Sequence, residues 1–232
     1  MPVHIHPTAP LAPRALLPGD PGRARAPAQL VLSEPKMFNH NRGLWGYTGT
    51  AADGEPLTIQ STGIGGPSAA IVMEELCDLG LERAIRVGTC GALARDLAFG
   101  DLVIADAALA VDGTSRALGA GGRVAADEGL VAALRAAAGD GARTGTVASS
   151  DLFYDRNGAR VRGWADAGAL AVEMEAATLL RVAELRGVRA GCLLAVTDLF
   201  ERGGRRRIDP EALVLAAERL GEIGAAALRV EG

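Results

Sequence analysis

Short apolar runs alternate along the chain with longer stretches in which apolar positions repeat at helical spacing. The runs are rich in Val, Ile and Leu, and they predict strands at residues 14–19, 57–62, 83–89, 100–110, 142–150, 168–175 and 189–198. The intervening stretches are rich in Ala, Leu, Glu and Arg, and they predict helices at residues 66–80, 127–138, 175–186 and 209–229. This alternation predicts an α/β fold, with a central mixed β-sheet flanked by helices on both faces.

Three segments interrupt the alternation. Residues 34–56 carry Gly, Asn and aromatic residues, and they predict a loop and a hairpin that lead into strand 57–62. Residues 112–126 and 200–208 are polar and rich in glycine, which predicts loops. No internal repeat or low-complexity linker divides the 232 residues, of which 49% are hydrophobic. We therefore expect a single domain, residues 1–232, around one sizeable core.

Composition and charge argue against several classes of protein. The net charge is −4 and the pI is about 5.5, which argues against nucleic-acid binding through a broad basic surface. Lys36 is the only lysine, so the chain has neither a Walker A loop nor a credible Schiff-base lysine. Residues 1–19 lack the apolar core of a signal peptide, and no run approaches the roughly 20 apolar residues that span a bilayer. We expect a cytoplasmic protein that binds neither nucleic acid nor membrane.

The potential metal ligands are few and scattered. The three cysteines are far apart and show no CxxC spacing, which indicates a reducing compartment and neither a disulfide framework nor a zinc site. His4 and His6 would lie on one face of a strand, but no third ligand of sensible spacing stands nearby. We therefore expect no metal site.

The chemically reactive residues stand at the ends of predicted strands. Ligands of open α/β sheets bind outside the carboxyl ends of the strands. Five predicted strands end in such residues, namely Gly19-Asp20, Thr62-Gly63, Gly88-Thr89, Glu173-Met174-Glu175 and Thr197-Asp198. These ends could converge on one cleft.

Arginines indicate an anion site in that cleft. Arg86 lies in a strand that otherwise reads as fully buried, and a buried arginine is costly unless it pairs with an acid or a bound anion. The pattern of apolar residues leaves both partners open. The hydroxyl of Thr89 and the N–H groups of the turn at 88–91 favour an oxyanion cradle. Similarly, Arg23 follows a Gly-Asp-Pro-Gly turn, which fits either an anion site or a solvated turn.

Carboxylates indicate a sugar site and a general acid. Glu173 and Glu175 would share one face of a strand. There they could bind vicinal sugar hydroxyls or complement a helix dipole. Asp198 ends an apolar strand and is either a candidate general acid or an N-cap. The charged run at 201–209 is either a solvated surface or a flap that carries a catalytic arginine.

Eight motifs occur in an order that resembles a known family. They are PVHI, LPGDPGRAR, NRGLWGYTG, STGIGGPSAAIVMEEL, IRVGTCGAL, ASSDLFY, VEMEAATLL and AVTD. Together they resemble the nucleoside phosphorylases, a family that includes hexameric bacterial purine nucleoside phosphorylase, uridine phosphorylase and archaeal methylthioadenosine phosphorylase. The resemblance runs from about residue 2 to residue 200. It implies phosphorolysis of purine (2′-deoxy)ribonucleosides to free base and (deoxy)ribose 1-phosphate, with inorganic phosphate as co-substrate and no cofactor.

The resemblance also implies a role for individual residues. Those that would hold phosphate are Gly19, Arg23, Arg42, Arg86 and Thr89, and Arg25 would lie on the surface. Those that would contact the ribose are His4, Met174 and Glu175. Those that would line the base pocket are Cys90, Gly91, Phe153 and Val172. Asp198 would protonate purine N7, and the catalytic set would be Asp198, Arg86 and Arg23.

Two of these roles imply an oligomer. Arg42 and His4 would act in the site of a neighbouring subunit, so a monomer would have incomplete sites. The resemblance therefore implies a homo-oligomer, a dimer within a hexamer.

Some features leave the substrate open. Several motifs are similar in sequence to those of uridine phosphorylase, but the Gln-x-Arg pair that recognises uracil in that enzyme is missing after Tyr154. Asp198 is the purine-type residue, and which of Arg205, Arg206 and Arg207 assists it stays open. The alternatives are a uridine or methylthioadenosine phosphorylase, a hydrolytic nucleosidase and a non-catalytic nucleoside-binding protein.

Overall fold

The computed structural model describes residues 2–155, 157–201 and 204–229. In this part of the chain, eleven strands form one sheet in the order β11-β10-β6-β8-β9-β5-β1-β4-β3-β2, with β7 paired to β6. The strands are β1 Arg14–Pro18, β2 Ser33–Asn39, β3 Gly46–Thr50, β4 Pro56–Gln60, β5 Arg83–Ala92, β6 Leu102–Ala110, β7 Arg123–Ala125, β8 Ala142–Ser149, β9 Ala171–Glu173, β10 Arg189–Glu201 and β11 Gly204–Arg207. The helices are α1 Pro21–Val31, α2 Gly66–Asp78, α3 Gly113–Ala117, α4 Glu128–Ala138, α5 Gly158–Asp166, α6 Ala176–Arg186 and α7 Pro210–Ala227, with short 3-10 turns η1 Asn41–Gly43 and η2 Gly139–Gly141.

The sheet is mixed, and part of it closes on itself. Strand β5 runs parallel to β1 and to β10, whereas its pairing with β9 is antiparallel. The pairings β10–β6, β6–β8, β8–β9, β9–β5 and β5–β10 form a complete ring of strands. Strands β1, β4, β3 and β2 extend from β5 as an open sheet. The predicted mixed sheet is confirmed, and the ring brings the ends of β5, β9 and β10 together.

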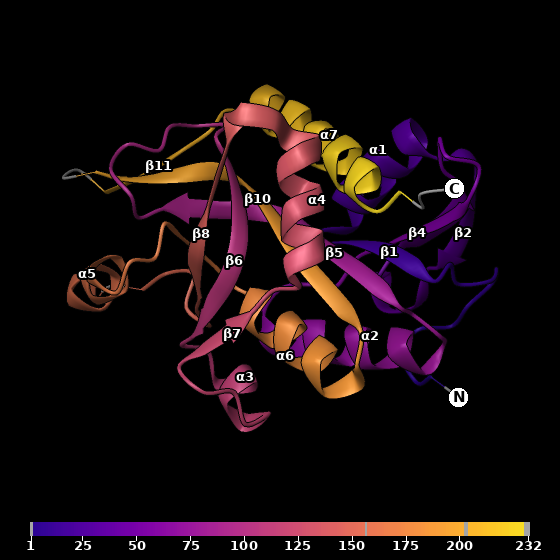
Figure 1. Cartoon of the computed structure of the whole chain (residues 1–232), viewed down its shortest axis with the longest axis horizontal. Coiled ribbons are helices and arrows are strands. Elements are labelled where there is room, and N and C mark those ends of the chain that lie inside the picture. The colour runs from indigo at the N-terminus through magenta and orange to yellow at the C-terminus, as the bar shows by residue number, and fades with distance from the viewer. Residues whose placement is uncertain (1, 156, 202–203, 230–232) are drawn as a thin grey trace.

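Helices cover both faces of the sheet (Figure 1). Helices α1, α4 and α7 supply residues such as Ala28, Leu134 and Leu220 to the core on one face. Helices α2 and α6 supply residues such as Met73 and Val182 to the core on the other face. Successive residues of a strand point to opposite faces, and β1 accordingly sends Leu16 to the first core and Ala15 and Leu17 to the second. Among the described residues, no helix is both long enough and apolar enough to cross a membrane.

The structure corrects several local predictions. Residues 112–126 are not one loop, because they contain α3 and β7. Residues 200–208 are not a loop in their described part, because β10 continues to Glu201 and pairs antiparallel with β11. Strand β9 is shorter than the predicted 168–175. The sequence does not predict helices α1 and α5, because α1 begins at a Gly/Pro turn and contains Pro27, and the nine residues of α5 carry little apolar periodicity.

Candidate active site

A cavity of about 900 Å³ opens at the carboxyl ends of β1, β5 and β10. It brings together residues from all five strand ends that the sequence singled out. Of the predicted site residues, those that line it are Gly19, Arg23, Arg86, Thr89, Cys90, Gly91, Phe153, Val172, Met174, Glu175 and Asp198. Arg42 and His4 lie outside this cavity.

Arg86 of β5 pairs with acids, which is one of the two alternatives that the sequence left open. Its side chain is only 5% exposed, its Nε donates to Glu173 Oε2 at 2.9 Å, and its Nη2 lies 2.5 Å from Glu175 Oε2. Burial alone would lower the pKa of Arg86, but Glu175 and Glu173 raise it above its usual value, so the side chain stays charged. Its buried Nη1 has no hydrogen-bond partner among the described residues. One edge of the guanidinium is therefore paired internally, and another is available to an anion.

A second arginine lies beside it. The turn at 19–22 begins helix α1, because Asp20 caps the helix by accepting a hydrogen bond from the Arg23 N–H at 2.9 Å. Arg23 Nη1 donates to Thr89 Oγ1 at 3.2 Å. Burial lowers the pKa of Arg23, and the nearby charges of Arg86 and Arg207 act in the same direction, although Asp20 opposes them. Adjacent positive charges at a helix N-terminus form a site suited to an anion.

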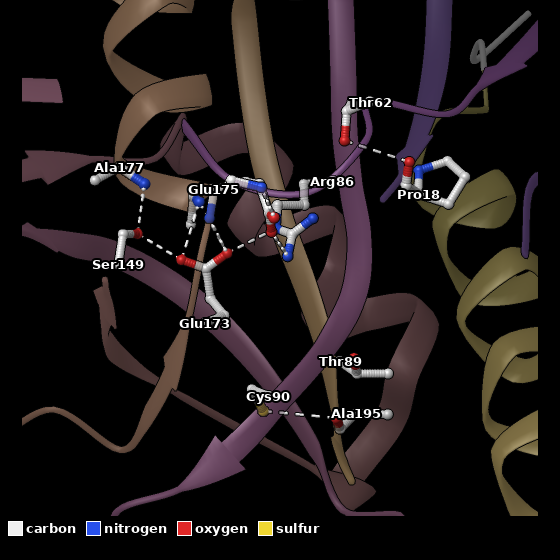
Figure 2. A network of polar contacts seen from close by, with 12 residues as sticks. Pro18, Thr62, Arg86, Thr89, Cys90, Ser149, Glu173, Glu175, Ala177 and Ala195 are labelled. Carbon is white, nitrogen blue, oxygen red and sulfur yellow. Dashed lines mark hydrogen bonds and ion pairs between the residues drawn. The ribbon is translucent and has the colours of Figure 1, made fainter. Parts of the chain in front are cut away.

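Glu173 and Glu175 occupy different environments (Figure 2). Glu173 accepts hydrogen bonds from Ser149 Oγ, Arg86 Nε and the Ala176 N–H, so it is a fully buried acid at the start of α6. Glu175 Oε1 accepts from the Gly65 N–H at 2.6 Å. Burial raises the pKa of Glu175 above its usual value, and Glu173 adds to this effect, although Arg86 opposes it. The helix-dipole role fits Glu173, whereas Glu175 faces the cavity with its oxygens held in place.

Asp198 lies near the end of β10, where it pairs in register with Gly91 of β5, and it lines the cavity. It is only 5% exposed, and its Oδ2 accepts from Thr197 Oγ1 at 2.9 Å. Its Oδ1 has no hydrogen-bond partner among the described residues, and Arg205 Nε lies 3.6 Å from it. Asp198 continues the strand, so it does not serve as an N-cap.

Arg205 connects Asp198 with the aromatic wall of the cavity. Its guanidinium lies 3.8 Å from the centre of the Phe153 ring and 5.4 Å from that of Phe200. Its Nη2 also donates to the Phe153 carbonyl oxygen at 3.1 Å. Because Arg205 belongs to β11, the short hairpin of β10 and β11 sets its position. Among the three candidate arginines, Arg205 forms an ion pair with Asp198.

The cysteines and histidines form no metal site among the described residues. Cys77, Cys90 and Cys192 are free thiols. Burial raises the pKa of Cys90 and of Cys192, and it raises that of Cys77 to about 11. A raised pKa favours the protonated thiol over the nucleophilic thiolate.

Comparison with known proteins decides the family. The model of the phosphorylase superfamily matches residues 13–229. The chain belongs to this superfamily. A guanosine phosphorylase from Halorubrum lacusprofundi is 39% identical over 201 residues, which cover 85% of this chain and 83% of the relative. A DeoD-type purine nucleoside phosphorylase from Clostridium beijerinckii is 38% identical over 211 residues, which cover 88% of each chain.

The fold agrees with that of solved members. A crystal structure of uridine phosphorylase from Vibrio fischeri, complexed with 6-hydroxy-1-naphthoic acid, superposes with a TM-score of 0.83 at 27% identity. The match covers 94% of this chain and 90% of that one. The predicted resemblance and the predicted fold are both confirmed.

Several residues that the sequence analysis did not single out also line the cavity of the present chain. They include Ile64, Leu152, Tyr154, Asp155, Trp164 and Phe200. A Cβ atom on Gly91 would lie 2.8 Å from the Phe200 ring, so Gly91 lets this ring enter the cavity. Phe200 stands in the segment 200–208 that the sequence predicts to be a loop, and Trp164 stands where the apolar pattern predicts no element, so the pattern marks neither residue. Asp155 had a signal, since it stands where the uracil-reading pair is missing.

Proposed function

We propose that the protein catalyses the phosphorolysis of purine ribo- and 2′-deoxyribonucleosides, giving free base and pentose 1-phosphate. The observation that carries this proposal is the composition of the cavity. Arg86, whose buried Nη1 has no hydrogen-bond partner among the described residues, lines this cavity together with Arg23, and so does Asp198, whose buried Oδ1 also lacks such a partner there. The relatives named purine nucleoside phosphorylase support the choice of substrate.

The arginine side of the cavity fits phosphate. Arg23 and Arg86 would pair with the dianion, while Thr89 Oγ1 and the backbone at Gly19 would complete its cradle. A Cβ on Gly88 would lie 2.9 Å from Arg86 Nη2, so this glycine leaves room for the guanidinium. Arg86 is held by two carboxylates, so it is already oriented before phosphate binds. Such preorganisation lowers the cost of positioning the nucleophile.

The sugar would lie between the phosphate and the base, over Met174. Each oxygen of a carboxylate has two lone pairs. Gly65 and Arg86 can therefore hold Glu175 in place while it accepts hydrogen bonds from the 2′ and 3′ hydroxyls. The anionic carboxylates and phosphate would also stabilise the positive charge that develops on the ribose during bond cleavage.

Glycosidic cleavage needs an acid at the base. When the C1′–N9 bond breaks, its electron pair goes to the purine, and a phosphate oxygen bonds to C1′ from the opposite face with inversion. Asp198 in its protonated form would donate its proton to N7, a role that contributes about 10²–10⁴-fold in rate. Arg205, 3.6 Å from Asp198 Oδ1, would then stabilise the carboxylate that remains. Each step uses phosphate and side chains of the protein, so the proposal includes no cofactor.

His4 and Arg42 would complete the site of a neighbouring subunit. Both lie outside the cavity of their own chain, and Arg42 is exposed with a φ of 56° in η1. We therefore propose a homo-oligomer, a dimer within a hexamer, that works in the reducing cytoplasm with its three thiols free. An active species of monomer size in light scattering would contradict the shared site.

Uridine is the second candidate substrate, because the solved uridine phosphorylase has the same fold over most of the chain. Base release from uridine, adenosine, inosine, guanosine and 5′-methylthioadenosine, each with phosphate, tests the choice. We expect release from the purine nucleosides and little from uridine. Release from uridine alone would move the protein to the pyrimidine branch and contradict the role of Asp198.

A further inference from the structure

Asp155 belongs to the cavity, but the mechanism above does not use it. It lies in the loop between β8 and α5, directly after Phe153 and Tyr154. Its side chain is 8% exposed and it lines the cavity. Its Oδ1 accepts a hydrogen bond from the Asn157 N–H at 2.8 Å, which fixes the orientation of the carboxylate.

The other oxygen of Asp155 is not satisfied. Oδ2 is buried and receives no hydrogen bond from the described residues. Arg160 Nε lies 2.9 Å from Oδ2 but does not donate to it in hydrogen-bond geometry. Arg160 is 48% exposed, so solvent competes for its side of this ion pair and weakens it. A buried carboxylate oxygen without a donor is unfavourable, and a ligand in the cavity could supply the missing donor.

Asp155 and Asp198 approach the cavity from different elements. Asp198 belongs to the sheet, whereas Asp155 leads into α5, which lies apart from the other helices in Figure 1. Arg205 contacts both Asp198 and Phe153, and Asp155 follows Phe153 by two residues. The same cavity is lined by Phe153, Asp155 and Asp198, so a purine base bound there could contact both carboxylates.

We propose that Asp155 determines specificity by accepting hydrogen bonds from N1–H and the 2-amino group of a 2-amino-6-oxopurine. This assignment rests on the proposed function. An ionised carboxylate only accepts hydrogen bonds. A 2-amino-6-oxopurine offers it two adjacent donors, and a 6-oxopurine without the amino group offers one. A 6-aminopurine instead presents the lone pair of N1, which the carboxylate repels. The order of preference is therefore guanosine, then inosine, then adenosine.

The variant Asp155→Asn tests this order. The amide oxygen can still accept from the Asn157 N–H, so the loop keeps its hydrogen bond. The amide nitrogen replaces Oδ2 and turns an acceptor into a donor. With saturating phosphate, we expect kcat/KM for guanosine to fall roughly 10- to 100-fold, as for loss of a hydrogen bond to a charged group. The value for adenosine should stay constant or rise, because N1 of adenine accepts from the new donor.

Asp166→Asn is the matched control, because Asp166 is an exposed acid at the end of α5 outside the cavity. It should leave the guanosine-to-adenosine ratio unchanged. An unchanged ratio in Asp155→Asn would overturn the proposal and leave Asp155 as a residue that only shapes the loop. A wild-type preference for adenosine would overturn it as well.

Failure of the proposed function would look different, because no purine nucleoside would then be cleaved with phosphate. Calorimetric binding of guanosine and of adenosine, without phosphate, tests Asp155 independently of turnover. We expect guanosine to bind more tightly to the wild type and to lose this advantage in Asp155→Asn. Equal loss for both nucleosides would contradict the assignment.

Discussion

At the scale of single residues, Arg86 shows which properties of a buried charge can be predicted from the sequence and which cannot. The pattern identified Arg86 as a buried charge and left an internal ion pair and a bound anion as alternatives. The structure shows why the two do not exclude each other, since Glu173 and Glu175 occupy Nε and Nη2 while Nη1 stays unpaired among the described residues. The sequence could not predict this division, because it depends on the orientation of one guanidinium between two strands.

This pairing decides which arginine gives a clean test. Removing Arg86 would leave two buried carboxylates without their counter-ion, which costs about 3–5 kcal/mol and would confound any effect on phosphate. Within the described part of the chain, Arg23 instead makes one side-chain hydrogen bond, to Thr89. We expect Arg23→Ala to keep the fold and to raise KM for phosphate roughly 10- to 100-fold, as one charge-assisted contact is lost. Steady-state kinetics at varied phosphate measure this change.

Arg25→Ala is the matched control, because Arg25 is exposed on the same helix and does not line the cavity. It should leave KM for phosphate unchanged. If Arg23→Ala behaved like Arg25→Ala, the phosphate site would lie elsewhere.

Glu75 of α2 anchors the N-terminal segment that carries His4. It accepts from the backbone N–H groups of Val3, His4 and Ile5 and lies 2.7 Å from His4 Nδ1. Burial alone would raise the pKa of Glu75, but the hydrogen bonds from His4 and from these backbone groups lower it overall. A carboxyl with a lowered pKa stabilises the folded state above its unfolded pKa, and the contribution is lost as pH falls through the folded pKa.

We therefore expect Glu75→Gln to lower the free energy of unfolding by about 1–3 kcal/mol at pH 7. The difference from the wild type should shrink below about pH 4.5, the ordinary pKa of a glutamate. Urea denaturation at several pH values and one protein concentration measures it. Glu74→Gln, on the same helix, should have a smaller effect that does not depend on those backbone groups. A pH-independent difference for Glu75→Gln would contradict the role of its charge.

At the scale of elements, the strands were easier to predict than the helices around the site. Seven strands and four helices follow the apolar pattern, because each buries a face that the sequence must keep apolar. Helix α1 escaped prediction because it begins in a Gly-Pro turn and contains Pro27. Strand β11 escaped because its side chains, Arg205, Arg206 and Arg207, are polar and exposed, so its pairing with β10 leaves no hydrophobic signal.

The packing of α1 on α7 gives a test at this scale. A Cβ atom on Gly221 of α7 would lie 2.5 Å from Pro27 Cβ, so the two helices are close because Gly221 has no side chain. Replacing glycine by alanine within a helix ordinarily stabilises it by about 0.5–1 kcal/mol. We expect Gly221→Ala to destabilise the protein by about 1–3 kcal/mol instead, because the helices must move apart. Denaturant unfolding measures the free energy of unfolding and therefore shows whether the variant is stabilised or destabilised.

Gly163→Ala in α5 is the control, because a Cβ there meets nothing within 4 Å. It should be neutral or slightly stabilising. If Gly221→Ala behaved in the same way, the close approach of α1 and α7 would not exist in solution.

At the scale of the whole molecule, the strand ends explain why so much of the site could be predicted. Parallel strands β1, β5 and β10 direct their carboxyl ends toward one side, so residues distant in sequence reach one cavity. Trp164, Phe200 and Asp155 could not be predicted in this way, and Phe153 was predicted only from the family resemblance. They come from α5, its preceding loop and the end of β10, which depend on tertiary packing rather than on periodicity.

The central claim is that phosphate, and not water, attacks the nucleoside. The most direct measurement is hypoxanthine release from inosine by the purified protein with and without inorganic phosphate, with the sugar product identified by ³¹P NMR. The account predicts release only with phosphate, and ribose 1-phosphate in amounts equal to the base. Equal release without phosphate, with free ribose as product, would contradict it and would make the protein a nucleosidase.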